Sequence, residues 1–171
     1  GGDLTAVELD RDLAAYIRQT YPEVRLIEAD AARVNWDEVL GETVPKVVAN
    51  LPYNVGTTIV MQMLRMTGRF ESVTVMLQKE VVARMLAKPG TKTYGSLSVH
   101  LQARAAPVFL FDVPPNSFFP PPKVISSVVR LVLFSEPKVG DVEPAYFDKV
   151  VTAAFSQRRK TIVNSLKALY G

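Results

Sequence analysis

The stretch Val44-Pro45-Lys46-Val47-Val48-Ala49-Asn50-Leu51-Pro52-Tyr53 decides the fold of this 171-residue chain. Its apolar first part predicts a short strand that ends at Ala49. Pro52, whose ring holds φ at about −65°, stiffens the loop that follows. Residues 57–66 then carry apolar side chains at helical spacing. The stretch therefore predicts a strand, a rigid loop and a helix, which is a repeating unit of an α/β sheet.

The loop Asn50-Leu51-Pro52-Tyr53 also has a chemical use. The exocyclic amino group of adenine is a poor nucleophile, because its lone pair is delocalised into the ring. The side-chain oxygen of Asn50 and the backbone carbonyl of Leu51 can accept its two N–H protons, and Tyr53 can stack on the ring. The loop therefore predicts a site that alkylates N6 of adenine. An alternative, if the loop is taken alone, is that these residues merely form a turn between a strand and a helix.

Periodicity along the rest of the chain predicts an alternation of strands and helices. Strands are expected at 4–9, 24–29, 46–49, 72–77, 106–111 and 125–134, and helices at 10–19 (with Asp10 as the N-cap), 36–40, 57–66, 79–86, 96–103, 144–155 and 159–169. This order predicts a doubly wound α/β sheet with an antiparallel pair at its end. Glu8, Asp30 and Asn50 lie at or near the ends of three strands, the edge at which such sheets bind ligands.

Composition limits the classes of function. The chain is 48% hydrophobic, has no cysteine and one histidine, and has no apolar run near the about 18–20 residues of a membrane helix. We therefore expect a folded domain with no thiolate chemistry, no metal and no membrane partner. Residues 1–42 hold ten acids and four basic residues, and the remainder holds sixteen basic residues and seven acids. The basic part suits a phosphate backbone, although an ordinary solvated surface would look the same.

A second motif lies further along the chain, as Phe118-Phe119-Pro120-Pro121-Pro122-Lys123-Val124-Ile125-Ser126. Two more stretches accompany it, one from Gln78-Lys79-Glu80-Val81 to Tyr94-Gly95-Ser96-Leu97-Ser98 and one at 154–161. With the Asn50 loop, these motifs resemble the KsgA-type family of rRNA adenine N6,N6-dimethyltransferases. The resemblance covers nearly the whole chain in the family's order.

The resemblance implies a fold, a cofactor and roles for particular residues. The fold would be the Rossmann-like sheet of class I methyltransferases, with helices on both faces, and the cofactor S-adenosyl-L-methionine. Glu8 would bind the cofactor's ribose and Asp30 its adenine, with Asn50 beside them. Tyr53 and Phe118 would sandwich the target adenine. The full set of expected site residues comprises Asn50, Leu51, Pro52, Tyr53 and Phe118 for catalysis, Glu8, Asp30 and Asn50 for the cofactor, and Lys123, Arg158, Arg159 and Lys160 for RNA.

The resemblance also implies a substrate. The expected reaction is dimethylation of two adjacent adenosines near the 3′ end of small-subunit rRNA, by a cytoplasmic monomer that acts on a precursor of the small ribosomal subunit. Two alternatives stay open: a 23S rRNA methyltransferase of the macrolide-resistance type, and a non-catalytic RNA-binding assembly factor. The stretches that begin at Gln78 and Tyr94 favour the small-subunit enzymes.

The chain departs from the family pattern at both ends. No stretch matches the first strand and glycine-rich loop, Glu-x-Gly-x-Gly-x-Gly, which hold the methionine part of the cofactor. We therefore expect a truncated chain, with a methyltransferase domain at 1–137 and the beginning of a helical RNA-contacting domain at 138–171. Phe119, which follows the predicted stacking residue, is expected to pack in the core.

Overall fold

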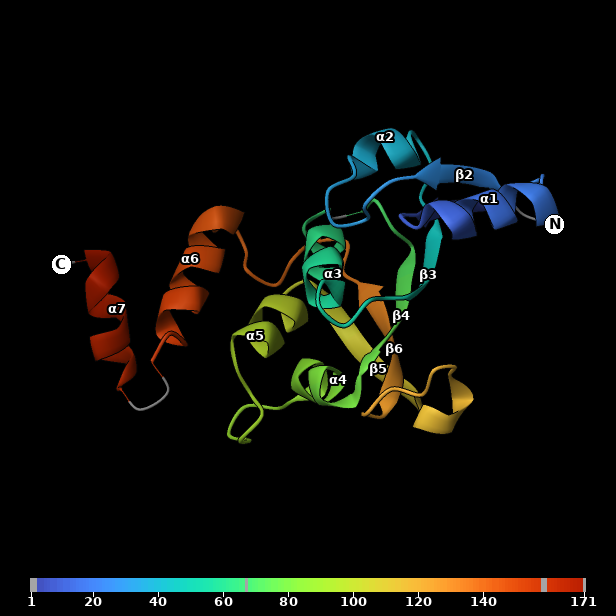
Figure 1. Cartoon of the computed structure of the whole chain (residues 1–171). Helices are drawn as coiled ribbons and strands as arrows, with labels where there is room; N and C mark the ends of the chain where they lie inside the picture. Colours follow the sequence, from blue (N-terminus) through green and yellow to red (C-terminus); the bar gives the residue numbers. More distant parts are fainter. Residues whose placement is uncertain (1–2, 67, 158–159, 171) are drawn as a thin grey trace. The chain divides into compact units, whose positions relative to one another are not determined.

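A computed structural model describes residues 3–66, 68–157 and 160–170 of the chain. The chain divides into two compact units, Gly1–Thr43 and Val44–Gly171. Figure 1 shows the order of the elements along the chain.

The first unit holds two parallel strands and two helices. These are β1 (Thr5–Glu8), α1 (Arg11–Thr20), β2 (Arg25–Glu28) and α2 (Trp36–Leu40). Strands β1 and β2 pair in register, with Glu8 opposite Glu28 at their carboxyl ends. Helix α1 begins where the sequence predicts, because the Asp10 carboxylate accepts hydrogen bonds from the backbone N–H groups of Asp12 and Leu13.

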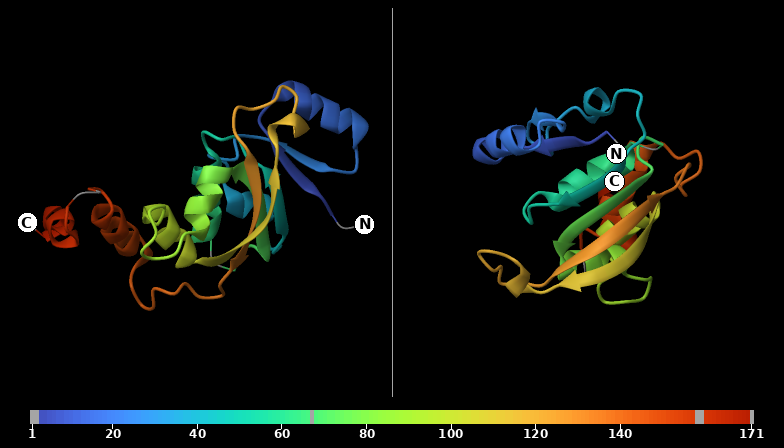
Figure 2. Two further views of the ribbon diagram at one scale, coloured as in Figure 1. Left: turned by 90° about the horizontal axis from the view of Figure 1, so that it is seen from below. Right: turned by 90° about the vertical axis from the view of Figure 1, so that its right-hand side faces the viewer.

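The second unit is built on a four-stranded sheet of order β3-β4-β6-β5. Its strands are β3 (Lys46–Asn50), β4 (Ser72–Gln78), β5 (Ala105–Val113) and β6 (Ser126–Leu133). Strands β3 and β4 are parallel, and β6 runs antiparallel to both β4 and β5. The right-hand view of Figure 2 shows these four strands as one twisted layer.

Three helices follow strands β3 and β4 in this unit: α3 (Gly56–Arg65), α4 (Lys79–Leu86) and α5 (Ser96–Gln102). Strand β4 alternates strictly between half-buried and buried residues, so that one face of the sheet carries the core. Helices α4 and α5 both pack against β5. The fully buried side chains come from the sheet and from these helices and include Ile59, Met63, Leu77, Met85, Leu101 and Leu131.

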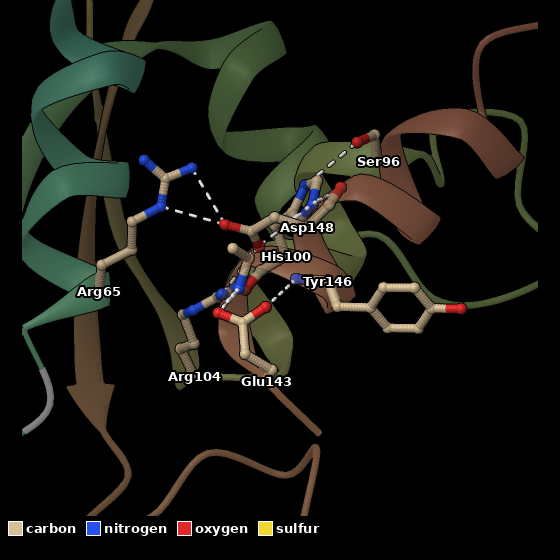
Figure 3. A network of polar contacts seen from close by, with 8 residues as sticks. Arg65, Ser96, His100, Arg104, Glu143, Tyr146 and Asp148 are labelled. Atoms are coloured by element: carbon tan, nitrogen blue, oxygen red, sulfur yellow. Dashed lines mark hydrogen bonds and ion pairs between the residues drawn. The ribbon is translucent and has the colours of Figure 1, made fainter. Parts of the chain in front are cut away.

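Helix α6 (Pro144–Ala154) is tied to this core by Asp148, and α7 (Ile162–Tyr170) packs against α6. The Asp148 carboxylate accepts a 2.7 Å bond from Arg104 and a 3.1 Å bond from Arg65 on α3. His100 on α5 lies 3.3 Å from the Asp148 carbonyl oxygen. Arg104 is only 5% exposed and also stacks over the Phe147 ring. Figure 3 shows these side chains converging on Asp148, which fixes the position of α6.

These observations confirm the α/β fold class and, to within a few residues at their ends, the strands and helices that the sequence predicts. Residue 159, where the last predicted helix begins, lies outside the described residues. The strands are hydrogen-bonded as two sheets, β1-β2 and β3-β4-β6-β5. The expectation for Phe119 is wrong, since its side chain is 100% exposed. It lies in a proline-rich segment beyond the sheet edge, where no strand directs it into the core. Among the described residues, no helix has the length and apolar character that crossing a lipid bilayer requires.

Candidate active site

The Asn50 loop leaves the carboxyl end of β3 and is fixed on both sides by backbone hydrogen bonds. The Leu51 N–H donates to the Met76 carbonyl on β4, and the Pro52 carbonyl accepts the N–H of Gly56 at 2.8 Å as α3 begins. Leu51 is buried, and Asn50 is exposed. Among the described residues, no hydrogen-bond partner is found for the Asn50 side-chain amide. The loop therefore presents this amide from a rigid base.

Gly56 allows α3 to begin close to this loop. A Cβ atom at position 56 would lie 3.1 Å from the Cβ of Leu51, tighter than most side-chain contacts. The small residue thus keeps the start of the helix against the loop's buried leucine.

Tyr53 is held by a residue far away in the sequence. Its hydroxyl lies 2.7 Å from the hydroxyl of Ser126, the first residue of β6. Ser126 is 0% exposed, whereas Tyr53 is 38% exposed. A buried partner thus anchors the hydroxyl end of the ring while part of Tyr53 stays accessible, as a stacking surface requires.

The topology brings the Phe118 segment to the same sheet edge as the Asn50 loop. Gln78 at the end of β4 pairs with Ser126, which pairs with Val113 at the end of β5. Residues 114–125, which include the 3₁₀ turn Pro115–Ser117, connect β5 to β6 beyond this edge. Phe118 is half-buried there, and its N–H donates to the Pro115 carbonyl. A sandwich of adenine between Tyr53 and Phe118 stays a prediction.

A cluster formed by Lys79, Asp112 and Ser127 lies at the same edge of the sheet. The Lys79 ammonium at the start of α4 bonds one carboxylate oxygen of Asp112, and the buried Ser127 hydroxyl donates to the other at 2.6 Å. These two hydrogen bonds, that of Lys79 first, lower the pKa of Asp112 below its ordinary value. The Lys79 N–H also donates to the Ile125 carbonyl, just before Ser126. The cluster therefore joins α4, β5 and the start of β6.

Glu8 and Asp30 lie where the sequence places them, in the first unit. Glu8 ends β1, and its Oε1 accepts a 2.8 Å bond from the Asp10 N–H. Asp30 lies two residues beyond β2, where its Oδ1 accepts a 2.8 Å bond from the Ala32 N–H and its Oδ2 lies 3.5 Å from the Arg33 guanidinium. Both carboxylates are half-buried and make local turn contacts, so their cofactor roles stay predictions.

Of the residues expected to contact RNA, Lys123 and Lys160 are exposed. Arg158 and Arg159 lie outside the described residues. Sequence reasoning gave no role to Ser126, Ser127 or Asp112, which the structure places around the Asn50 loop edge. Ser126 stands within a quoted motif, but its bond to Tyr53 spans 73 positions and leaves no local signal.

Comparison with known proteins decides the family. The model of the ribosomal RNA adenine dimethylase family matches residues 2–171. The chain belongs to the ribosomal RNA adenine dimethylase family. This membership agrees with the motifs around Asn50 and Phe118.

Curated relatives agree with this family. The chain is similar to the ribosomal RNA small subunit methyltransferase A of Thiobacillus denitrificans, with 48% identity over 168 residues that cover 97% of this chain and 65% of the relative. The protein of the same name from Acinetobacter baylyi is 44% identical over 170 residues, with 97% and 62% covered. The chain thus spans less than two thirds of the length of either relative.

Solved structures show the fold. A dimethyladenosine transferase from Plasmodium falciparum matches with a TM-score of 0.81 at 23% identity, covering 96% of this chain and 59% of the other. The 23S rRNA methyltransferase ErmE matches with a TM-score of 0.73 at 24% identity, covering 97% and 66%. These likenesses confirm the Rossmann-like α/β fold that is expected for the chain.

Proposed function

We propose that this protein transfers methyl groups from S-adenosyl-L-methionine to N6 of two adjacent adenosines in small-subunit rRNA. The observation that carries the proposal is the Asn50 loop, with an exposed amide on a rigid base and an aromatic ring anchored by Ser126. Membership of the ribosomal RNA adenine dimethylase family supports the choice of base and reaction.

The protein's part in the reaction is positioning. The side-chain oxygen of Asn50 and the carbonyl of Leu51 accept the N–H protons of the adenine amino group, which turns its lone pair towards the incoming methyl group. Tyr53 and Phe118 hold the ring of an adenine that has left its stack. When bound, S-adenosyl-L-methionine supplies an electrophilic methyl group. The acceptors on Asn50 and Leu51 would hold N6 of the adenine where it can take up this methyl group and release a proton.

The first unit fits the cofactor by the chemistry of its donors. Carboxylates follow both parallel strands at their carboxyl ends, Glu8 on β1 and Asp30 after β2. A carboxylate in such a position can accept ribose hydroxyl groups, and a second can accept an adenine amino group. Glu8 and Asp30 are therefore the residues that would hold the nucleoside part of the cofactor.

Small-subunit rRNA is the preferred substrate because the curated relatives carry that name at 42–48% identity. The likeness to ErmE rests on 24% identity and concerns the fold. We further propose that Lys123, Arg158, Arg159 and Lys160 contact the RNA backbone. We also propose that the protein acts as a monomer, in the cytoplasm, on a precursor of the small ribosomal subunit. The boundary between its methyltransferase domain and its helical RNA-contacting domain is proposed to lie between residues 137 and 138.

The test compares two asparagine variants in the transfer of labelled methyl groups to unmethylated small ribosomal subunits. Asn50→Ala removes the proposed acceptor and is expected to lower turnover at least 100-fold, while RNA binding stays within about twofold. Asn164→Ala, at an exposed position of α7, is the control and is expected to keep full turnover. Equal turnover of Asn50→Ala and the parent protein would refute the mechanism.

A further inference from the structure

A cleft of about 810 Å³ lies within the second unit, between the loop that joins α4 to α5 and a set of residues at the end of α6 and before and at the start of α7, namely Ala154, Phe155, Gln157, Lys160 and Ile162. Figure 1 shows that loop and the two helices. Its lining includes two aromatic residues, Tyr94 and Phe155, and three basic residues, Arg84, Lys92 and Lys160. The volume is in the range of pockets that bind small organic groups.

The aromatic part of the lining comes from two distant segments. Tyr94 and Phe155 meet edge to face, with ring centroids 6.2 Å apart at 68°. Tyr94 is half-buried and Phe155 is exposed, so both side chains are accessible to a ligand. An accessible aromatic pair offers a face on which a nucleobase can stack.

The cationic part of the lining comes from Arg84, Lys92 and Lys160. Arg84 is paired with Glu80, one turn before it on α4. Lys92 and Lys160 are exposed, and no carboxylate partner is found for either ammonium among the described residues. The cleft therefore carries two cations that are available to an anionic ligand.

Hydrogen bonds hold the loop side of the cleft and the helix that precedes Phe155. On the loop side, the buried Ser98 hydroxyl donates to the Arg84 carbonyl at 2.6 Å and accepts the Gly95 N–H at 3.1 Å. On the α6 side, Asp148 ties the helix to Arg104 and Arg65 (Figure 3). Because the loop side is already ordered, less conformational entropy is lost there when a ligand binds.

We propose that this cleft binds a single-stranded segment of the RNA substrate, with a base on Tyr94 and Phe155 and its phosphates beside Lys92 and Lys160. Accessible aromatic rings beside unpaired cations match the alternation of base and phosphate in a single strand. A duplex does not match, because its bases are stacked on one another and do not offer their faces. The proposal rests on the proposed function only for the nature of the substrate.

The test measures binding of a 5′-fluorescein-labelled oligouridine by fluorescence anisotropy over a range of salt concentrations. Lys92→Gln is compared with Lys88→Gln, a change of the same charge in the same loop at a residue that does not line the cleft. Lys92→Gln is expected to weaken binding and to reduce the slope of log K against log salt by about 0.7, the value for one phosphate contact to a single strand. Lys88→Gln is expected to keep the parent slope.

The base contact is tested at Tyr94. Tyr94→Leu is expected to weaken oligouridine binding at least about fivefold, because base stacking contributes about 1–3 kcal/mol. Tyr94→Phe keeps the ring and is expected to restore binding. Equal effects of Lys92→Gln and Lys88→Gln, or parent-like binding by Tyr94→Leu, would overturn the proposal. The proposal would also be overturned if Lys92→Gln and Tyr94→Leu weakened binding of a labelled RNA duplex as much as binding of oligouridine, since a general basic surface would give that result.

Methyl transfer separates this proposal from the proposed function. With saturating small subunits, Lys92→Gln is expected to keep the parent turnover and to raise KM for the subunit. If the parent protein transfers no methyl group but the Lys92 and Tyr94 effects on oligouridine hold, the proposed function fails and the cleft stands. If methyl transfer occurs without those effects, the cleft proposal fails alone.

Discussion

Ser126→Ala removes the hydroxyl that anchors Tyr53 and leaves the rest of the Asn50 loop unchanged. The lost bond is 2.7 Å long and joins a partly exposed ring to a fully buried serine. A hydrogen bond of this kind contributes about 1 kcal/mol net, and the freed Tyr53 hydroxyl can turn to water. If the anchor orients the ring in the transition state, the same energy corresponds to a loss of about fivefold in kcat.

Two variants of the same bond give a sharper test than either alone. Tyr53→Phe keeps the stacking ring and removes the other half of the bond, so it is also expected to lower kcat about fivefold. Because both changes break one interaction, the double variant is expected to be no slower than the slower single variant. The assay is turnover of labelled methyl transfer with saturating RNA and cofactor.

Ser127→Ala is the matched control. Ser127 is a buried neighbour whose hydroxyl bonds Asp112 and not Tyr53. Ser127→Ala is expected to lower the free energy of unfolding without the fivefold loss in kcat. A double variant about 25-fold slower than the parent, or Tyr53→Phe at the parent rate, would refute the anchoring role of Ser126.

Two further predictions concern stability, measured as the free energy of unfolding in urea. Asp148→Ala leaves the nearly buried guanidinium of Arg104 without its carboxylate and is expected to cost about 3 kcal/mol. Glu71→Ala breaks an exposed ion pair and is expected to cost less than about 1 kcal/mol; equal losses would contradict the buried role of Asp148. Asp112 has a lowered pKa in the folded protein, so its stabilising contribution is present above the unfolded-state pKa of about 3.9 and is lost as pH falls through the lower folded-state pKa. The stability of Asp112→Asn is therefore expected to fall less steeply than that of the parent below about pH 4, and parallel curves would rule out this contribution.

The sequence predicts the elements well because their signals are local. The alternation along β4 and the Asp10 cap of α1 are each contained within a few residues, and both appear in the structure. The Asn50 loop is recognised for the same reason, since its chemistry and its stiffness lie in four consecutive residues.

The rest of the site depends on pairing between distant strands. Ser126 contacts Tyr53 because β6 lies between β4 and β5 in the sheet, and no local sequence pattern predicts this strand order. Asp112 acquires its partners Lys79 and Ser127 through the same registers. The sequence predicts that Phe119, which follows the stacking residue Phe118, points into the core, whereas the path of the segment beyond the sheet edge leaves it exposed. Nonlocal register, rather than composition, decides these positions.

The most direct test of the central claim is analysis of the nucleosides after the protein has reacted with S-adenosyl-L-methionine and unmethylated small ribosomal subunits. The account predicts N6,N6-dimethyladenosine at two adjacent positions of the small-subunit rRNA, and, over the same initial reaction time, at most about a hundredth of that amount when Asn50→Ala replaces the parent protein. Methylation of large-subunit rRNA instead would contradict the proposed substrate. Methylation at an atom other than adenine N6 would contradict the role of the Asn50 loop.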